Sequence, residues 1–230
     1  MIVSIVVTFL AFRFNINFYV DLTMLSIAII FPLVFTIRGS FRRREKALQH
    51  LSKFRSALKT VDYFVMSNKE LSVESKKEMT DILLNISEQT MDQLKNNGDN
   101  TKDLDDIIDK VLTFIVANDE TVSKNLKDRT FRFMKDLHES IENLHAINTH
   151  RTPISLKAYC LVFIYIFPLI YAPTIIFDVG LENNQGITYF IVLLTEFILI
   201  SLYNIQDQLE YPFDDIGLDD INLETFKLNR

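Results

Sequence analysis

The sequence predicts an all-α membrane protein with four transmembrane helices and a helical bundle outside the membrane. Two observations carry this prediction. Apolar residues gather in residues 1–37 and 158–205, whereas residues 38–157 are rich in charge and show helical periodicity. The mean hydropathy of the whole chain, +0.14, lies between the values of typical soluble and membrane proteins. The class is therefore decided by where the apolar residues lie, not by how many there are.

The first apolar block, residues 1–37, is predicted to form a transmembrane hairpin. Residues 18–37 are long enough to cross a bilayer, which takes ~20 apolar residues. Residues 1–12 reach that length only if the helix continues to Asn17 and includes Arg13, so we expect this opening helix to be shortened at its start. A cleavable signal peptide is the alternative, but the stretch has neither a basic N-terminal region nor a small-residue cleavage site.

Residues 38–157 are predicted to form a helical domain. Apolar residues at three- and four-residue steps between Leu48 and Val65 should extend the second span into one long helix. Residues 96–100 read as a turn. Amphipathic stretches flank this turn, and another covers residues 122–144; their expected buried positions are Ile82, Leu83, Ile86, Leu94, Ile107, Leu112, Phe114, Ile115, Leu126, Phe133, Leu137, Ile141 and Leu144. Four such faces require a common core, which a helical bundle provides.

The second apolar block, residues 158–205, is predicted to form a second hairpin with spans at 159–177 and 187–203. Ahead of it, Thr152 should cap a helix that has Pro153 in its first turn. Glu196 falls near the middle of the last span, where an ionisable side chain is costly. We therefore expect it to face protein and not lipid.

The basic residues predict the orientation of these spans. All but three of the 24 Lys and Arg residues lie between residues 38 and 157, the exceptions being Arg13, Lys227 and Arg230. Several of them directly follow the second span, where the positive-inside rule applies most strongly. The middle of the chain and the acidic C-terminal tail, residues 206–230, should therefore be cytoplasmic.

The composition argues against several functions. A net charge of −6 disfavours a nucleic-acid partner. Cys160 is the single cysteine, so one chain cannot form a disulfide framework or a multi-thiolate metal site. Neither a glycine-rich phosphate-binding motif nor a nucleophile with a nearby base is present, so we expect neither an enzyme nor, apart from a calcium site considered below, a bound cofactor.

Several short motifs resemble the bestrophin family. They are Arg151-Thr152-Pro153-Ile154 before the third span, Phe167-Pro168 within it, and the tail segment Leu209-Glu210-Tyr211-Pro212-Phe213 with the acids that follow. Their order and spacing cover most of the chain. The chain also departs from the family pattern: Ser155 replaces a proline, Asp214 replaces a glycine, Arg43-Arg44-Glu45 stands where the family has Arg-Trp-Trp, and there is no tryptophan.

The resemblance implies a homopentamer in which the second helices line a central pore. Aligning Arg43 with the family's arginine places the narrow neck of that pore at Ile27, Phe31 and Phe35. The spacing of four keeps these side chains on one helix face, ~6 Å apart along the axis. Five copies of each would form stacked apolar rings of the kind that gate by dewetting. The alternative is that this stripe faces lipid or another helix.

Below the neck, Arg38, Arg42 and Arg43 are candidates for an ion vestibule that attracts anions, because rings of arginine favour anions. The alternative is that these residues mark the cytosolic boundary or pair with Glu45 and other acids.

The family also suggests a calcium site in the tail, with Asp214, Asp215, Asp219 and Asp220 as oxygen ligands. In the alternative, these acids are simply solvated, and the tail runs along a neighbouring subunit.

Taken together, the residues and the resemblance predict a bestrophin-like oligomeric ion channel in a lipid bilayer. It would pass small ions through a hydrophobic neck, with chloride slightly favoured over cations. The alternative is a membrane scaffold or sensor of the same architecture that does not conduct.

Overall fold

The computed structural model describes residues 1–96, 102–180 and 185–229. In chain order its elements are α1 (Ile2–Arg13), α2 (Leu22–Ser67), α3 (Val73–Lys95), α4 (Lys102–Ala117), α5 (Lys124–Thr149), α6 (Ile154–Val179), α7 (Gln185–Leu209) and the short 3-10 helix η1 (Leu223–Phe226). No strand occurs in these three ranges, which confirms the all-α prediction. Two compact units form: unit 1 combines residues 1–41 with 152–210, and unit 2 combines residues 42–151 with the tail from Tyr211.

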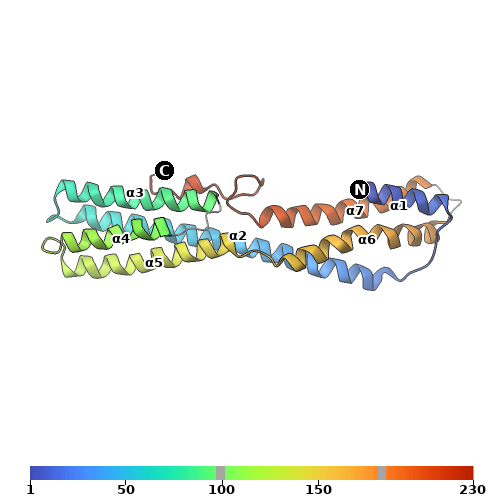
Figure 1. Ribbon diagram of the computed structural model, residues 1–230, viewed down its shortest axis with the longest axis horizontal. Coiled ribbons are helices and arrows are strands. Elements are labelled where there is room, and N and C mark those ends of the chain that lie inside the picture. Colours follow the sequence, from blue (N-terminus) through green and yellow to red (C-terminus); the bar gives the residue numbers. More distant parts are fainter. Residues whose placement is uncertain (97–101, 181–184, 230) are drawn as a thin grey trace. The chain divides into compact units, whose positions relative to one another are not determined.

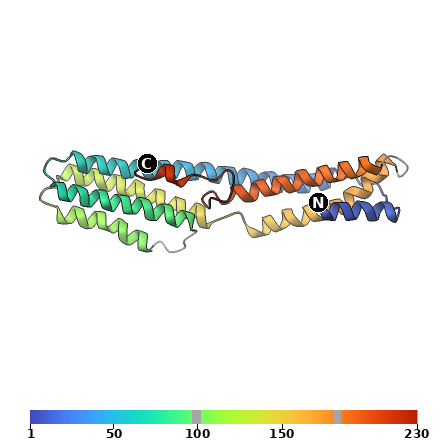
Figure 2. The same cartoon turned by 90° about the horizontal axis from the view of Figure 1, so that it is seen from above.

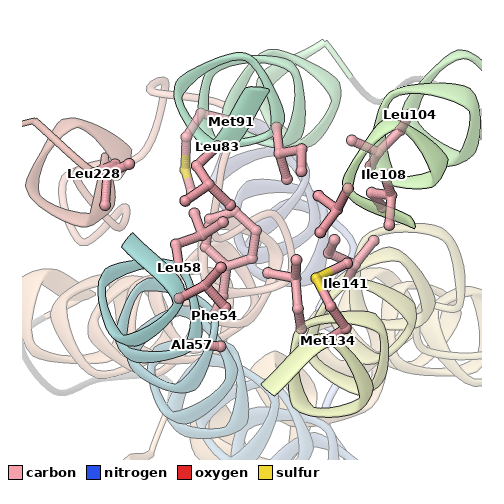
Figure 3. Packing of buried hydrophobic residues seen from close by; sticks show 14 of the residues in the cluster. Phe54, Ala57, Leu58, Leu83, Met91, Leu104, Ile108, Met134, Ile141 and Leu228 are labelled. Carbon is pink, nitrogen blue, oxygen red and sulfur yellow. The ribbon is translucent and has the colours of Figure 1, made fainter. Parts of the chain in front are cut away.

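Unit 2 is a helical bundle in which α3, α4 and α5 lie alongside the second part of α2 (Figure 1). Figure 3 shows apolar side chains from these helices pointing into one core, among them Phe54, Leu58, Leu83, Ile108 and Ile141. The expected apolar faces are confirmed with one correction. Leu112 is 49% exposed, because α4 turns Leu104, Ile108 and Val111 into the core instead.

Serine caps begin two helices of unit 2. The Ser72 hydroxyl accepts a hydrogen bond from the Ser75 N–H at the start of α3, and Ser123 does the same for the Leu126 N–H in α5. Each serine satisfies a backbone donor that has no partner within its helix. The turn predicted at 96–100 lies outside the described residues except for Asn96, whose N–H donates to the Asp92 carbonyl and ends α3.

The tail packs onto its own chain. Phe213, Ile221, Leu223 and Leu228 belong to the core of unit 2. The Arg55 Nε donates to the Lys227 carbonyl of the tail at 3.0 Å, and the Leu228 N–H donates to the Ser87 hydroxyl at 3.0 Å. The tail therefore contacts α2 and α3 of the same chain, a contact that the sequence did not predict.

Unit 1 contains α1, the first part of α2, α6 and α7 (Figure 2). Its small core joins three helices through Ile29, Leu33, Ile164, Phe167 and Leu199. The helix α1 packs against α6 and α7 and buries Ser4, Thr8 and Ala11. Side chains this small allow close approach of helix backbones, as is common between membrane helices.

The helix α2 is continuous over 46 residues, which confirms the prediction that the second span extends into one long helix. It begins at Leu22 and not at residue 18. The Asp21 carboxylate accepts the N–H of Thr23 at 2.9 Å, so Asp21 satisfies a donor of the first turn and ends the preceding loop.

The predicted start of α6 is wrong by one position. Pro153 occupies the N-cap and makes no side-chain cap bond. The N–H of Thr152 donates instead to the Glu210 carboxylate at 2.7 Å. A tertiary contact thus replaces the expected local cap. Pro168 and Pro173 both lie inside α6, as expected for a membrane helix whose neighbours compensate the missing backbone bonds.

Three helical stretches of the described residues are long and apolar enough to cross a membrane: α2, the stretch that ends in α6, and α7. The helix α1 has 12 residues and rises ~18 Å, less than the ~30 Å thickness of the hydrocarbon layer. A fourth crossing therefore stays a prediction.

Candidate functional site

The three predicted neck residues lie on the outward side of α2 in unit 1. Ile27 is 46% exposed, Phe31 56% and Phe35 61%. The ring centroids of Phe31 and Phe35 are 6.1 Å apart. The structure thus brings the three side chains onto one face, as their spacing predicted.

The opposite side of α2 explains why this face points outward. Ile29 and Leu33 are 2% and 1% exposed and pack against α6 and α7. The helix is apolar on all sides here, so periodicity alone could not choose which side is buried. The outward side also carries Met24, Ile30 and Val34, which are exposed as well, and it is therefore wider than the neck stripe.

Pro32 leaves a gap in the hydrogen bonding of α2 within this stretch. Proline has no backbone N–H, so the carbonyl four residues earlier, that of Ala28, loses its helical partner. The Tyr159 hydroxyl of α6 donates to this carbonyl at 3.3 Å. Sequence reasoning missed Tyr159, although a proline inside a span is a signal that some neighbouring donor is needed.

The three predicted vestibule arginines do not share one face. Arg38 and Arg42 are exposed and stand one turn apart on the outward side of α2, whereas Arg43 is partly buried. One residue along a helix turns the side chain by ~100°, which separates Arg43 from Arg42. The vestibule of Arg38, Arg42 and Arg43 stays a prediction.

The four tail acids do not form one cluster. The Asp220 carboxylate accepts the N–H of Gly217 at 2.8 Å, and burial together with a hydrogen bond to Asp214 raises the pKa of Asp220 to about 6. Asp215 pairs with Lys95. The backbone carbonyl of Asp219 accepts the Arg44 Nε.

In the part of the chain that the structure describes, no three His, Cys, Asp or Glu side chains gather as metal ligands. The calcium site in the tail stays a prediction.

Glu210 stands at the centre of a polar network that sequence reasoning missed. Its carboxylate is 1% exposed and lies 2.9 Å from the Lys157 ammonium. The Gln206 amide donates to the same group at 2.9 Å. Asp207 also pairs with Lys157, at 2.7 Å. The available signal was the predicted second hairpin itself, because Lys157 precedes its first span and Glu210 follows its last.

The charge of Lys157 depends on these partners. Burial of the ammonium acts to lower the pKa of Lys157, but the hydrogen bonds to Asp207 and Glu210 outweigh it and hold the pKa above its usual value. Lys157 therefore stays charged, and the network ties the start of α6 to the end of α7.

Glu196 of α7 is 1% exposed, which confirms that it faces protein. The amino group of Met1 lies 4.0 Å from its Oε1 atom, and neither carboxyl oxygen accepts a hydrogen bond from the described residues.

Comparison with known proteins places this architecture. No family model and no curated protein matches the sequence. Among solved structures, a bacterial bestrophin homologue from Klebsiella pneumoniae has a TM-score of 0.80 at 16% identity, covering 98% of this chain and 90% of that one. A single-substitution variant of a bestrophin homologue from the same bacterium also has a TM-score of 0.80, at 14% identity and 98% and 92% coverage.

A third match, described as a membrane protein variant, has a TM-score of 0.81 at 16% identity and 98% and 92% coverage. With its apolar helices, the chain is thus an integral membrane protein. Over almost its entire length, it has the fold of the bacterial bestrophin homologues.

Proposed function

We propose that the chain is one subunit of an oligomeric ion channel, a pentamer in which the α2 helices surround the ion path. The observation that carries this proposal is the fold shared with bestrophin homologues, together with the exposed apolar face of α2. Ile27, Phe31 and Phe35 would form the neck. The wider outward side of α2 leaves room both for lining a pore and for contact with a neighbouring subunit.

The orientation of the channel follows from its charges. The basic residues of unit 2 support a cytoplasmic position for that unit, which is part of this proposal. Ions leaving the neck toward the cytoplasm would then meet Arg38, one turn beyond Phe35 on the same side of α2. One Arg38 side chain from each subunit would form a ring of exposed guanidinium groups around the ion path. Such a ring favours small anions such as chloride over cations.

Planar-bilayer recording of the purified protein in asymmetric potassium chloride tests the proposal. We expect unitary currents whose reversal potential shifts toward that of chloride. Arg38→Gln should move the reversal potential toward that of potassium. Absence of current from an intact oligomer, at all voltages and calcium concentrations tested, would favour the membrane scaffold or sensor instead.

The neck is tested by truncating its side chains. Ile27→Ala, Phe31→Ala and Phe35→Ala should each raise the basal current, because a wider and less apolar ring is easier to wet. Phe190→Ala is the matched control, since Phe190 of α7 is also an outward-facing phenylalanine, 65% exposed. Unchanged current in all three neck variants would remove this assignment while leaving the channel itself intact.

A further inference from the structure

A groove of about 370 Å³ lies on α2 within unit 2, next to the tail. It is lined by Ser52, Arg55, Ser56, Lys59, Thr60, Tyr63 and Phe226. The α2 members recur at three- and four-residue steps and so share one side of the helix. Phe226 comes from η1 and completes the lining, so the docked tail is part of this groove.

The charge of this groove differs from that of the chain as a whole. Its lining contains two bases and no acid, although the net charge of the chain is −6. A second groove of unit 2, between α3 and α4, mixes both signs and includes Glu74, Lys77 and Asp81. The α2 groove is therefore suited to an anion, whereas the second groove contains three acids and two bases.

Several hydrogen-bond donors in the groove are available to a ligand. The Arg55 Nε donates to the Lys227 carbonyl, which fixes the guanidinium and leaves its two terminal amino groups for other acceptors. Within the described ranges, the Lys59 ammonium and the hydroxyls of Ser52, Ser56 and Tyr63 form no hydrogen bond or ion pair. The Lys59 ammonium, the three hydroxyls and the terminal amino groups of Arg55 thus line one groove without an acceptor among the described residues.

This set of donors fits a group with several oxygen atoms. A guanidinium binds two oxygens of a phosphate side by side, and an ammonium adds a point charge. A halide ion would occupy only a small part of about 370 Å³. A volume of this size is instead typical of a site for a small molecule. The rings of Tyr63 and Phe226 offer apolar surface to the remainder of such a molecule.

The place of the groove along α2 favours a soluble ligand over a lipid. Arg55 belongs to unit 2 and follows Ile37, where the predicted span ends, by 18 residues of α2. The headgroup layer on one side of a bilayer is only ~5–8 Å thick. A separation of 18 residues along the chain therefore favours a soluble phosphate compound over a lipid headgroup at Arg55.

We propose that the groove formed by α2 and η1 binds a phosphate-bearing small molecule through Arg55 and Lys59. The inference goes beyond ion conduction and does not depend on it, because every residue of the groove belongs to unit 2 of one chain. Ligand binding in the groove would also stabilise the packing of the tail on α2, because Phe226 lines the groove and Arg55 donates a hydrogen bond to the Lys227 carbonyl.

Isothermal titration calorimetry with inorganic pyrophosphate tests the proposal on the full-length protein in detergent at constant ionic strength. We expect saturable binding that Lys59→Gln weakens at least about tenfold, as the loss of one charge-assisted contact should. Tyr63→Phe should weaken it about two- to fivefold, because it removes a single hydroxyl while keeping the ring. Exchanging gluconate for chloride should leave the affinity unchanged.

Lys76→Gln is the matched control. Lys76 of α3 is also partly buried and lies outside the groove, so its loss should change the affinity less than twofold. Absence of saturable binding would overturn the proposal. If Lys59→Gln and Lys76→Gln weaken pyrophosphate binding equally, the binding reflects general charge attraction and the proposal is overturned too. Displacement of pyrophosphate by chloride would show that the groove is a halide site instead.

Discussion

The two units of the chain bury their side chains in opposite ways. In unit 2, large apolar side chains such as Phe54 and Phe114 are 0% and 3% exposed. In unit 1, comparable side chains point outward: Phe9 is 57% exposed, Phe190 65% and Phe197 56%. Its buried positions instead include polar groups, among them Glu196 and Glu210, each 1% exposed.

This difference shows which solvent each unit is built for. In water, burying apolar surface stabilises a fold by ~25 cal/mol per Å², so unit 2 gathers its apolar side chains into one core. Lipid tails are as apolar as leucine, so exposing phenylalanine side chains to lipid carries no free-energy penalty for unit 1. The helices of unit 1 must therefore associate through close packing and polar contacts. The comparison predicts that apolar truncations harm unit 2 most, whereas polar truncations harm unit 1 most.

The largest expected effect is that of a core truncation in unit 2. Phe54→Ala should lower the free energy of unfolding of this unit by about 3–5 kcal/mol, because it removes a fully buried ring and leaves a cavity. Hydrogen exchange of the amides of α3 and α5 in the full-length protein measures this change. Phe31→Ala removes the same ring from an outward position and should leave these amides unaffected. Equal losses in the two variants would break the comparison.

A polar truncation in unit 1 should come next. Glu210→Ala should destabilise the α6–α7 pair by about 3 kcal/mol, because the buried carboxylate is removed while the Thr152 N–H and the Gln206 amide lose their acceptor. Amide exchange in α6 and α7 reports the change. Asp207→Ala removes the other acid partner of Lys157, but Asp207 is 50% exposed, so we expect less than about 1 kcal/mol. A larger destabilisation by Asp207→Ala than by Glu210→Ala would show that burial of the carboxylate does not determine how much it stabilises the α6–α7 pair.

The acidic tail should make the stability of unit 2 depend on pH. The pKa of Asp220 is raised to about 6 by burial and by Asp214. A carboxyl whose folded pKa exceeds its unfolded pKa stabilises the fold below about pH 4, and this contribution is lost as the pH rises through 6. Asp220→Asn cannot ionise and should stabilise the tail by about 1 kcal/mol at pH 7, where partial exposure limits the effect.

Amide protection of residues 211–229, corrected for the intrinsic exchange rate, should fall between pH 4 and 7 in the unaltered protein and stay level in Asp220→Asn. Asp219→Asn is the matched control, since the structure uses the backbone carbonyl of Asp219 and not its carboxylate. A tail whose protection rises with pH would contradict the assignment.

The smallest expected effect concerns the proline gap in α2. Tyr159→Phe removes the donor to the Ala28 carbonyl and should cost unit 1 about 0.6 kcal/mol, a typical value for a hydrogen bond between membrane helices. Faster amide exchange around Pro32 would reveal it. Tyr165→Phe serves as the control, because Tyr165 is an exposed tyrosine of the same helix. If amide exchange around Pro32 is equally fast in both variants, the hydrogen bond from Tyr159 to the Ala28 carbonyl does not stabilise α2 at this proline.

The sequence alone determined what depends on local pattern. The positions of the apolar blocks, the length of α2 and the core positions from Leu51 to Val65 all follow from hydropathy and helical periodicity, because each is set by residues close together in the chain. The burial of Glu196 could be predicted as well, since a carboxyl in a span has no favourable place in lipid. The resemblance to bestrophins also came from short motifs, and the fold agrees with it.

Only the tertiary structure decided which of two equivalent faces is used. The first part of α2 is apolar all round, so the sequence could not tell that Ile29 and Leu33 turn inward while Phe31 and Phe35 turn outward. The network of Glu210 with Lys157 and Thr152 joins residues far apart in the chain, and it displaced the cap that local rules assigned to Thr152. Periodicity records the environment of one helix, whereas these choices depend on which helices pack against it.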